Sequence, residues 1–564
     1  MIAQPHPNAV DIGMPAPADV DVLVVGGGIN GAGIARDLAG RGLRVLLCEK
    51  DDLAQHTSSS STKLIHGGLR YLEYYEFSLV RKALAEREVL LKSAPHIMWP
   101  LRFVMPHDPS DKTLRPVWMI RLGLFLYDHL AKREVLPAST TVDLRKHPAG
   151  RALKPLFSKG YVYSDGWVDD ARLVVLNALD AVAHGAEVLT RWRCVDAQRS
   201  AAHWQVRLES TRGETRELRA RALVNAAGPW AAQFLAEHAH DAQPKSLRLV
   251  KGSHIVVPKM FDHEHAYIFQ NPDKRIIFAI PYENEFTLIG TTDVEHLGAV
   301  GEARISPDET AYLCEQASRY FARPVTPAQV VWSYSGVRPL LDDESGGDAS
   351  SVTRDYSLDL DWPAAGSPQG ATTRSGGLGA AAGSLLRQAP LLNVWGGKIT
   401  TFRKLAEEAA ELLAAPLAVT RGAWTHGALL PGGDLTSWIG PAQRPDTDFA
   451  RFAQALTLRH SALPASLCHR LARAYGARAE LVIGTGDLGA EIAPGLFEAE
   501  LHYLHTHEWA RSADDVLWRR SKLGLHLTPA QRAAVADWCA ANWPDAIAPV
   551  AASATPRTTE TAWN

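Results

Sequence analysis

The sequence is poor in cysteine and contains no long apolar run. It has five cysteines among 564 residues, and they are widely spaced. This spacing provides neither a disulfide framework nor a metal-ligand pair, so we expect no metal site and a reducing compartment. No stretch approaches the ~20 apolar residues that a membrane-spanning helix requires. A disulfide-rich secreted scaffold and an integral membrane protein are therefore not expected.

The sequence also lacks an excess of charge of one sign. Lysine and arginine total 59, aspartate and glutamate total 62, and the net charge is −3. No overall field favours nucleic acid, so we expect no nucleic-acid partner. Residues 1–19 lack the basic start and apolar centre of a secretion signal, and we expect a disordered leader there. The length and the 46% apolar content predict a globular enzyme of two or three domains.

A glycine cluster near the start of the chain predicts a dinucleotide site. Residues 21–25 predict a strand, residues 29–41 a helix and residues 44–48 a second strand. The spacing G-x-G-x-x-G falls between the first strand and the helix, at Gly26, Gly28 and Gly31. The first glycine permits a tight turn, the second lets a pyrophosphate approach the backbone, and the third lets helix and strand pack closely.

Glu49 completes this unit. It follows the second strand, about 20 residues after the glycines, where a carboxylate binds ribose hydroxyls. The N-terminus of the helix offers free N–H groups and a partial positive charge to phosphates. The alternative is a tight structural turn without a ligand, which a lone glycine triplet would also satisfy. The strand, helix, second strand and acid together favour dinucleotide binding.

Three later segments predict further contacts with the same ligand. Residues 57–71 place four serines between two threonines and then two glycines, which predicts a loop of hydroxyls and exposed N–H groups. Gly228 follows a buried-strand pattern at 222–226. Residues 391–401 repeat the order of strand, glycines and helix start, with Thr400 as the expected N-cap. The last segment suggests a second backbone contact to the ligand.

Other patterns divide the rest of the chain. Short β-rich runs between 247 and 293 predict an antiparallel sheet on the substrate side. Residues 330–339 predict a strand ending in a glycine turn that presents Arg338. A stretch rich in Gly, Ala and Ser at 361–389 predicts a surface loop, and residues 423–543 predict a helical domain. The apolar run 117–127, which has basic residues around it, predicts either an interfacial helix on a membrane or a core helix with basic ends.

Taken together, these residues resemble the aerobic FAD-dependent glycerol-3-phosphate dehydrogenases. The resemblance covers about residues 21–543 and includes the helices between the matching motifs. The family motif Ser-Lys-Leu-Ile-His-Gly-Gly-Leu-Arg-Tyr appears with Thr62 in place of the serine, which keeps the hydroxyl. The loop at 361–389 is longer than in the family. The matching segments are Gly26–Ile34, Ser58–Glu73, Lys251–Pro258, Gly290–Asp293, Tyr334–Leu340 and Gly396–Lys404.

The resemblance implies oxidation of sn-glycerol 3-phosphate to dihydroxyacetone phosphate by hydride transfer from C2 to non-covalently bound FAD. It also implies that electrons pass to a membrane quinone of the respiratory chain. The expected location is peripheral, on the inner, cytoplasmic face of the membrane, and a homodimer is a family-level expectation. The implied fold is α/β, with a glutathione-reductase-type FAD-binding domain, an inserted antiparallel-sheet substrate domain and an α-helical C-terminal domain.

The expected domain boundaries follow the chain. The FAD-binding domain comprises residues 20–99, 161–240 and 390–415, and the substrate domain comprises residues 100–160 and 241–345. A surface loop is expected at 346–389, the helical C-terminal domain at 423–545 and a disordered tail at 546–564.

The chemistry requires cations for a dianionic phosphate, a donor for the developing C2 oxygen charge, and a proton acceptor. By resemblance, Arg70, Tyr71 and Lys398 lie near the substrate phosphate. Arg338 is assigned to the C2-oxygen side, with a structural ion pair as the alternative. His66 and His254 compete as proton acceptor, and the sequence does not choose between them; a histidine in a strand is often a core residue.

The expected FAD contacts come from the glycine unit, the serine loop and two later turns. The start of the helix after residue 400 presents its positive end, which can stabilise the reduced flavin. The residues expected to contact FAD are Gly26, Gly28, Gly31, Glu49, Ser58, Ser61, Thr62, Leu64, Gly228, Gly397 and Thr400.

Three alternative functions remain open from the sequence. A glycerol-3-phosphate oxidase would pass electrons to oxygen, and no motif reports oxygen access. An oxidoreductase acting on an amine or a 2-hydroxy acid is disfavoured by Arg70 and Lys398, which suit a phosphate. A non-catalytic flavin-binding regulator is disfavoured because the candidate cleft residues are all present.

Overall fold

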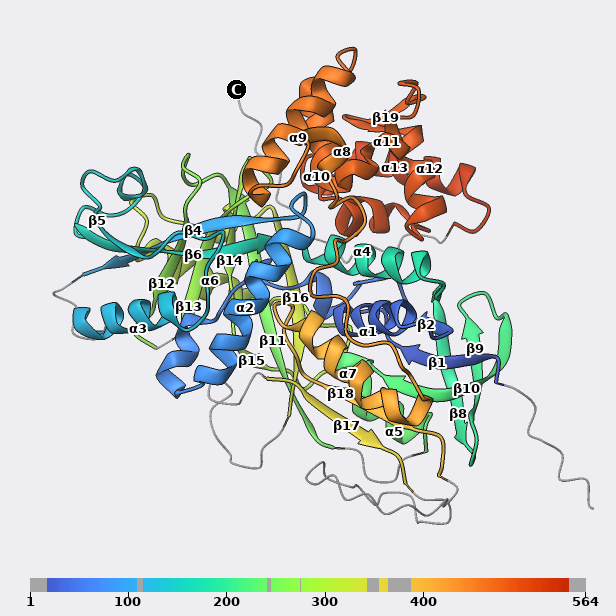
Figure 1. The fold of residues 1–564 in the computed structure, drawn as a ribbon. Helices are drawn as coiled ribbons and strands as arrows, with labels where there is room; N and C mark the ends of the chain where they lie inside the picture. The colour runs from blue at the N-terminus through green and yellow to red at the C-terminus, as the bar shows by residue number, and fades with distance from the viewer. Residues whose placement is uncertain are drawn as a thin grey trace, which may run out of the picture.

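The chain folds into two large sheets, each covered by helices, and a helical C-terminal domain (Figure 1). The computed structural model describes residues 18–108, 115–240, 245–273, 275–341, 355–363 and 387–546. The expected leader except its last two residues, and the expected tail except its first residue, lie outside these ranges.

The first sheet has a parallel centre, in the order β17-β18-β10-β1-β2-β7. Strand β1 pairs in parallel with β2 on one side and with β10 on the other, while β17 joins β18 in antiparallel fashion. Strands β8 and β9 extend β10 as a meander. The strands are β1 (Val20–Val25), β2 (Val45–Glu49), β7 (Glu187–Thr190), β8 (Trp192–Arg199), β9 (Trp204–Ser210), β10 (Thr215–Asn225), β17 (Ser357–Asp361) and β18 (Leu391–Trp395).

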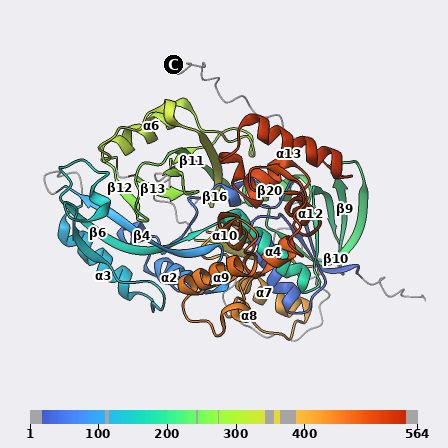
Figure 2. The same cartoon turned by 90° about the horizontal axis from the view of Figure 1, so that it is seen from above.

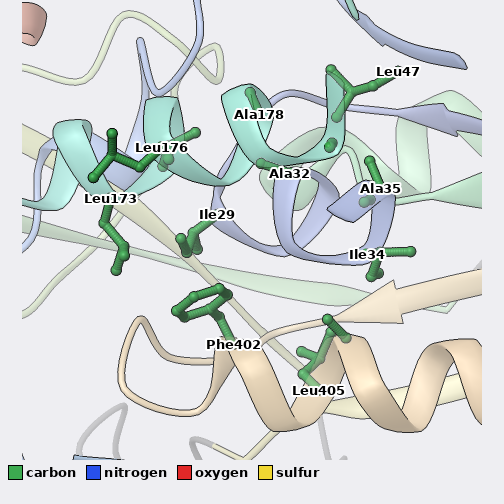
Figure 3. Close-up of a cluster of buried hydrophobic side chains, with 14 of the residues drawn as sticks. Ile29, Ala32, Ile34, Ala35, Leu47, Leu173, Leu176, Ala178, Phe402 and Leu405 are labelled. Atoms are coloured by element: carbon green, nitrogen blue, oxygen red, sulfur yellow. The ribbon is translucent and has the colours of Figure 1, made fainter. Parts of the chain in front are cut away.

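Both faces of this sheet are buried at its centre, where every residue of β1, β2 and β18 is buried and most are apolar. Alternate residues of β1 face opposite cores: Val22 and Val24 lie with the helices, whereas Leu23 packs with the meander. The helices on the first face are α1 (Ile29–Gly40), α4 (Asp170–Ala183) and α7 (Phe402–Leu417). Figure 3 shows α1 between α4 and α7, with Ile29 and Ala32 facing Leu176 and Phe402.

The second sheet is mostly antiparallel and runs in the order β15-β11-β14-β13-β12-β4-β6-β3, with β16 paired to β11 and β5 paired to β6. The single parallel pair within this order is β12 with β4. The strands are β3 (Leu64–Ile65), β4 (Met98–His107), β5 (Thr140–Asp143), β6 (Lys159–Val168), β11 (Leu247–Pro258), β12 (Ala266–Gln270), β13 (Ile276–Tyr282), β14 (Phe286–Gly290), β15 (Val294–Glu295) and β16 (Trp332–Leu341).

Helices cover this second sheet on both faces as well. One face packs against α6 (Pro307–Ser318) through Leu313. The other face packs against α2 (Phe77–Ser93) and α3 (Val117–His129) through Leu84 and Leu124. Figure 1 places α3 at the outer end of the molecule, away from the first sheet.

The C-terminal region forms its own apolar core above α4, as Figures 1 and 2 show. Leu430 still belongs to the core of the first sheet, whereas Leu435 belongs to the C-terminal core. Its helices and short strands are α8 (Thr436–Ile439), α9 (Pro445–Arg459), α10 (Ala465–Tyr475), α11 (Ala479–Ile483), β19 (Glu491–Ala493), β20 (Leu496–Phe497), α12 (Glu498–His507) and α13 (Pro529–Asn542). A short helix, α5 (Ala231–Glu237), packs against the first sheet.

Several expected boundaries differ from the structure. The predicted divisions at 99/100 and 160/161 fall inside β4 and β6, because these strands pair along their full lengths in the second sheet. The predicted loop at 346–389 includes the strand β17, which extends the first sheet through β18. No turn occurs at Gly336, because β16 continues past it and Arg338 pairs with Val250 of β11.

No helix of the described residues is long and apolar enough to cross a membrane. No group of three histidine, cysteine or acidic side chains among them could hold a metal ion. All five cysteines are free and buried.

Candidate active site

A pocket lies at the carboxyl ends of the parallel strands of the first sheet, where α/β folds bind their ligands. The end of β1 contributes Gly26 and Gly28, and the end of β2 contributes Glu49. The ends of β10 and β18 contribute Gly228 and Gly397. Residues far apart in the chain therefore meet because their strands are parallel neighbours in one sheet.

The glycine unit at this pocket admits no side chains at two of its three positions. A Cβ on Gly26, where φ is +112°, would lie 2.5 Å from the carbonyl oxygen of Ala226. A Cβ on Gly31 would lie 1.9 Å from the carbonyl oxygen of Gly26, so Gly31 serves close packing and does not line the pocket. The N-cap residue of α1, Gly28, has no side chain to bond the free N–H groups of the first turn, and Ser58 Oγ from a neighbouring loop bonds the first of them, on Ile29.

Glu49 is a buried carboxylate held by backbone N–H groups. Its side chain accepts hydrogen bonds from Gly27 N at 2.6 Å and from Asp51 N at 2.8 Å. Burial raises the pKa of Glu49, and these backbone bonds oppose that rise. A fixed carboxylate at this place in the pocket suits ribose hydroxyls.

The serine loop connects the pocket to the second sheet. Ser58 Oγ accepts a hydrogen bond from Ile29 N at the start of α1, at 3.0 Å. Thr57 Oγ1 donates to the Val337 carbonyl of β16 at 2.7 Å. Gly336 is required in β16 because a Cβ there would lie 2.8 Å from the Cβ of Ser60. The glycine at 336 therefore admits the serine loop and does not form a turn.

His254 of β11 lies against this loop. Its Nε2 is 3.0 Å from Thr62 Oγ1, and its ring stacks on Tyr334, with the ring centroids 4.8 Å apart. Burial lowers the pKa of His254 well below its usual value, and the nearby Arg338 and Lys63 lower it further. The imidazole is therefore neutral at pH 7. Its Nδ1 is buried without a hydrogen-bond partner among the described residues.

Arg338 projects from β16 beside His254. It forms an ion pair with Asp293, and its Nη2 donates to Thr291 Oγ1 at 3.2 Å. The ion pair foreseen as an alternative thus exists, and it orients the guanidinium. The side chain remains 25% exposed, so a substrate can still reach it. Asp293 lies in a segment singled out by resemblance, and its role in holding Arg338 was not predicted.

Tyr71 and Lys398 are brought together from two distant segments, and Arg70 precedes Tyr71 in the chain. Lys398 Nζ lies 3.6 Å from the centre of the Tyr71 ring, a cation–π contact. Arg70 donates to Tyr74 Oη at 3.2 Å, but its Nε is buried without a hydrogen-bond partner among the described residues. A buried guanidinium N–H without an acceptor is unfavourable in the absence of a ligand, and an anion would satisfy it.

The backbone of His66 meets the side chain of Thr400. The His66 backbone N–H donates to Thr400 Oγ1 at 3.1 Å, and Thr400 is fully buried. Thr400 is therefore not the N-cap of α7, which begins at Phe402 after Thr401. The Thr400 hydroxyl bonds the His66 segment and does not cap α7, because Thr401 stands between Thr400 and the first residue of the helix.

Three remaining predicted FAD residues have other partners. Ser61 donates its hydroxyl to Asp170 at 2.7 Å, at the start of α4. Thr62 pairs with His254, as described above. Leu64 is 3% exposed and lies in the apolar core of the second sheet, so a direct contact with FAD remains a prediction without structural support.

The pocket has further polar and aromatic residues that the sequence analysis did not select. Asn30 donates to the Gly396 carbonyl at 3.0 Å and so joins the two glycine turns. His56 hydrogen-bonds Asp51 at 2.7 Å and packs edge-on against Trp230. Asn30 could have been found as the polar residue inside the glycine fingerprint, whereas nothing near His56 in the sequence distinguishes it.

The residues present fit FAD. The closed glycine turn, the glycine at the N-cap of α1 and Glu49 suit the pyrophosphate and ribose. The serine loop leads from there to His254 and Arg338, where a flavin ring and a small anionic substrate would meet. A cofactor that accepts a hydride, a neutral histidine and the cations Arg338 and Lys398 together suit oxidation of a phosphorylated alcohol.

Comparisons with known proteins agree with this arrangement. A family profile described as "FAD dependent oxidoreductase" matches residues 21–356, and one described as "C-terminal domain of alpha-glycerophosphate oxidase" matches residues 423–541. A solved structure of the glycerol-3-phosphate dehydrogenase from Bacillus halodurans, complexed with FAD, is 26% identical. It superimposes with a TM-score of 0.70 over 93% of this chain and 90% of that one.

Three curated relatives span nearly the whole chain. The "Glycerol-3-phosphate dehydrogenase" of Pseudomonas aeruginosa is 51% identical over 93% of this chain and 96% of its own length. The "Aerobic glycerol-3-phosphate dehydrogenase" of Escherichia coli is 48% identical over 92% of this chain and 97% of its own length. The "D-erythritol 1-phosphate dehydrogenase" of Brucella abortus is also 48% identical, over 93% of this chain and 98% of its own length.

Proposed function

The chain belongs to the family of FAD-dependent glycerol-3-phosphate dehydrogenases, and on that basis we propose how its site acts. The substrate is sn-glycerol 3-phosphate and the product dihydroxyacetone phosphate. Bound FAD supplies the acceptor for the hydride that leaves C2. The chain itself binds the phosphate, stabilises the C2 oxygen and accepts the hydroxyl proton.

The phosphate site consists of Arg70, Tyr71 and Lys398. The observation that carries the proposal is the buried, unpartnered Nε of Arg70, close in the chain to the Lys398–Tyr71 pair. A phosphate dianion supplies acceptors to both cations, and charge-assisted bonds to phosphate are among the stronger hydrogen bonds in proteins. A neutral alcohol without the phosphate offers no such partner.

Arg338 and His254 act at the C2 oxygen. The guanidinium, held by Asp293 and Thr291, donates to the oxygen as its negative charge develops. His254 is assigned the hydroxyl proton from its place beside Arg338; burial and two nearby cations lower its pKa, which keeps it neutral and also makes it a weaker base. His66 lies in the loop that carries Arg70 and serves as the second candidate, as a hydrogen-bond donor or as the base.

We assign a quinone as the electron acceptor and a membrane surface as the site of attachment, on the inner face of the membrane. The relatives are named dehydrogenases, which supports an acceptor other than oxygen. Helix α3 supports the membrane contact, because four of its large apolar side chains face solvent. Their exposed fractions are 65% for Trp118, 57% for Phe125, 49% for Leu122 and 40% for Met119.

An anaerobic flavin titration tests the function. With sn-glycerol 3-phosphate and no oxygen, the absorption band of bound FAD should bleach, whereas glycerol should leave it unchanged. Arg338→Ala should slow bleaching by at least about 100-fold, since removing one such donor costs on the order of 10²–10³ in rate. Bound flavin that never bleaches would remove the substrate assignment.

Two further additions identify acceptor and substrate range. After bleaching, a soluble quinone should restore the colour faster than oxygen does; the reverse order would assign an oxidase. D-Erythritol 1-phosphate is the comparison substrate, because one relative of equal identity is named for it. Faster bleaching with the four-carbon phosphate would reassign the substrate and retain the phosphate site.

A further inference from the structure

The loop of residues 66–71 carries His66, Arg70 and Tyr71, three of the residues proposed to act on the substrate. Two interactions of its backbone hold the start of the loop. The His66 N–H donates to Thr400 Oγ1, and the Gly67 N–H donates to Tyr127 Oη at 2.8 Å. The position of the cations therefore depends on groups outside the loop.

A buried cluster of three side chains lies behind Gly67. Tyr127 of α3 donates its hydroxyl to Asp165 Oδ1 of β6 at 2.7 Å. Arg87 of α2 donates from Nη1 to the same oxygen at 2.6 Å and to the Ser164 carbonyl at 2.9 Å. The exposed fractions are 2% for Tyr127, 3% for Asp165 and 1% for Arg87.

The chain passes so close to this cluster that only glycine fits. A Cβ on Gly67 would lie 2.7 Å from Tyr127 Oη and 2.4 Å from a methyl carbon of Leu84. The next residue, Gly68, has φ of +77°, and a Cβ there would lie 2.2 Å from the Tyr71 ring. The loop is therefore pressed against the cluster, and its own aromatic side chain folds back over it.

One hydroxyl makes two different bonds in this arrangement. Tyr127 Oη accepts from Gly67 N–H with its lone pair and donates its proton to Asp165. Burial raises the pKa of Tyr127 well above its usual value, so the proton remains available for donation. Gly67 N–H is also 3.3 Å from Asp165 Oδ1, a weaker contact. If the Tyr127 hydroxyl is removed, the Gly67 N–H keeps this longer contact with Asp165.

We propose that Tyr127, Asp165 and Arg87 are positioning residues for the substrate phosphate: through the Gly67 N–H, they hold the 66–71 loop so that Tyr71 meets Lys398 and Arg70 is held beside it in the chain. None of the three touches the pocket, and none was selected from the sequence. The proposal rests on the proposed function, because it specifies what sets the phosphate site.

Tyr127→Phe removes the hydroxyl and keeps the ring. The KM for sn-glycerol 3-phosphate should rise about fivefold, which corresponds to one hydrogen bond of typical net strength. Competitive inhibition by inorganic phosphate should weaken by a similar factor, while kcat changes less than twofold. Tyr161→Phe is the matched control: Tyr161 is equally buried in the same apolar core, and its hydroxyl has no hydrogen-bond partner among the described residues.

Hydrogen exchange and a second variant separate positioning from general destabilisation. In the FAD-bound protein without substrate, Tyr127→Phe should speed amide exchange in a peptide that covers the 66–71 loop and leave the strands of the first sheet unchanged. Asp165→Asn should raise the KM in the same direction. The double variant should be no worse than the poorer single variant, because both act through one N–H group.

The outcomes distinguish this proposal from the function on which it rests. If the unmodified protein does not bleach with sn-glycerol 3-phosphate, the proposed function fails. If it does, but Tyr127→Phe has the KM and the exchange pattern of Tyr161→Phe, the positioning role is refuted. Independent, multiplicative effects of the two variants would also refute it, since the residues would then act separately.

Discussion

At the scale of single residues, the fold sets the charge of a histidine when it buries a ring nitrogen without a hydrogen-bond partner. His96 lies between α2 and β4, fully buried, and neither ring nitrogen has a hydrogen-bond partner among the described residues. Burial, and then the cations Arg172 and Arg473, lower the pKa of His96 to about 3. His254 shows the same effect in the active site, where it keeps an imidazole neutral for catalysis.

The stability of the protein should therefore decline in mild acid through His96. Above pH 6.5 the histidine is neutral in both folded and unfolded chains, so it contributes no pH dependence. Below pH 6.5 the unfolded chain takes up a proton that the folded chain refuses, since the folded pKa is about 3. At pH 5.5 this costs about 1.4 kcal/mol of unfolding free energy.

Urea unfolding at pH 7.5 and pH 5.5 measures this contribution. His96→Met should lose about 1.4 kcal/mol less than the unmodified protein between the two pH values. The exposed His502 provides the control substitution, and His502→Met should keep the original pH dependence. Equal pH dependence in the His96 variant and the unmodified protein would contradict the assignment.

At the scale of elements, α3 has two functional faces. Its inner face carries Leu124 and Tyr127, which pack on the second sheet and reach the substrate loop. Its outer face carries Trp118, Leu122 and Phe125 in solvent, at the outer end of the molecule (Figure 1). The sequence left two interpretations of this helix open, and the structure combines a core face with an exposed apolar one.

The outer face should bind lipid. Trp118→Gln with Phe125→Gln removes the two most exposed large side chains of α3 and should weaken binding to phosphatidylcholine–phosphatidylglycerol vesicles at least about tenfold. Sedimentation with vesicles measures it. Leu458→Gln with Leu481→Gln removes comparably exposed apolar groups, 71% and 56%, from the C-terminal domain and should have no effect. Equal losses in both pairs would show that attachment does not use α3.

At the scale of the whole molecule, buried ion pairs join the C-terminal domain to the FAD pocket. Asp52 follows β2, three residues after Glu49, and its carboxylate is fully buried. Arg520 binds it with two bonds of 2.5 and 2.8 Å, and Arg519 adds one of 2.6 Å. Burial alone would raise the pKa of Asp52, but Arg520 and Arg519 hold it below its usual value. The end of β2, which lines the FAD pocket, is thus joined by ion pairs to a domain that supplies none of the residues lining that pocket.

Asp52→Asn should destabilise the protein by about 3–5 kcal/mol, because it leaves the buried guanidinium of Arg520 without its carboxylate, while Arg519 keeps its ion pair with Asp515. Urea unfolding of the FAD-bound protein measures the loss. The control is Asp19→Asn, since the exposed pair of Asp19 with Arg219 should contribute no more than about 0.5 kcal/mol. Similar small effects in both variants would mean that the ion pairs of Asp52 do not hold the C-terminal domain in place.

The sequence by itself determined the local chemistry of the protein. Residue type and short-range spacing specify the glycine turn, the helix that follows it and the acid after β2, because each depends on backbone geometry within one unit. The four β-rich runs between 247 and 293 are confirmed as β11 to β14, since their alternation and turn residues are local as well. Family motifs then identified the cofactor and the substrate class.

Only the tertiary structure decided which of these groups meet. Lys398 lies on Tyr71, and Thr400 accepts from His66, although more than 300 residues separate each pair. Strand pairing places β6 in the second sheet and carries β16 straight through Gly336. Close packing brings Tyr127 and Asp165 to support Gly67. Such contacts arise from the burial of whole elements against one another, and no local pattern in the sequence encodes them.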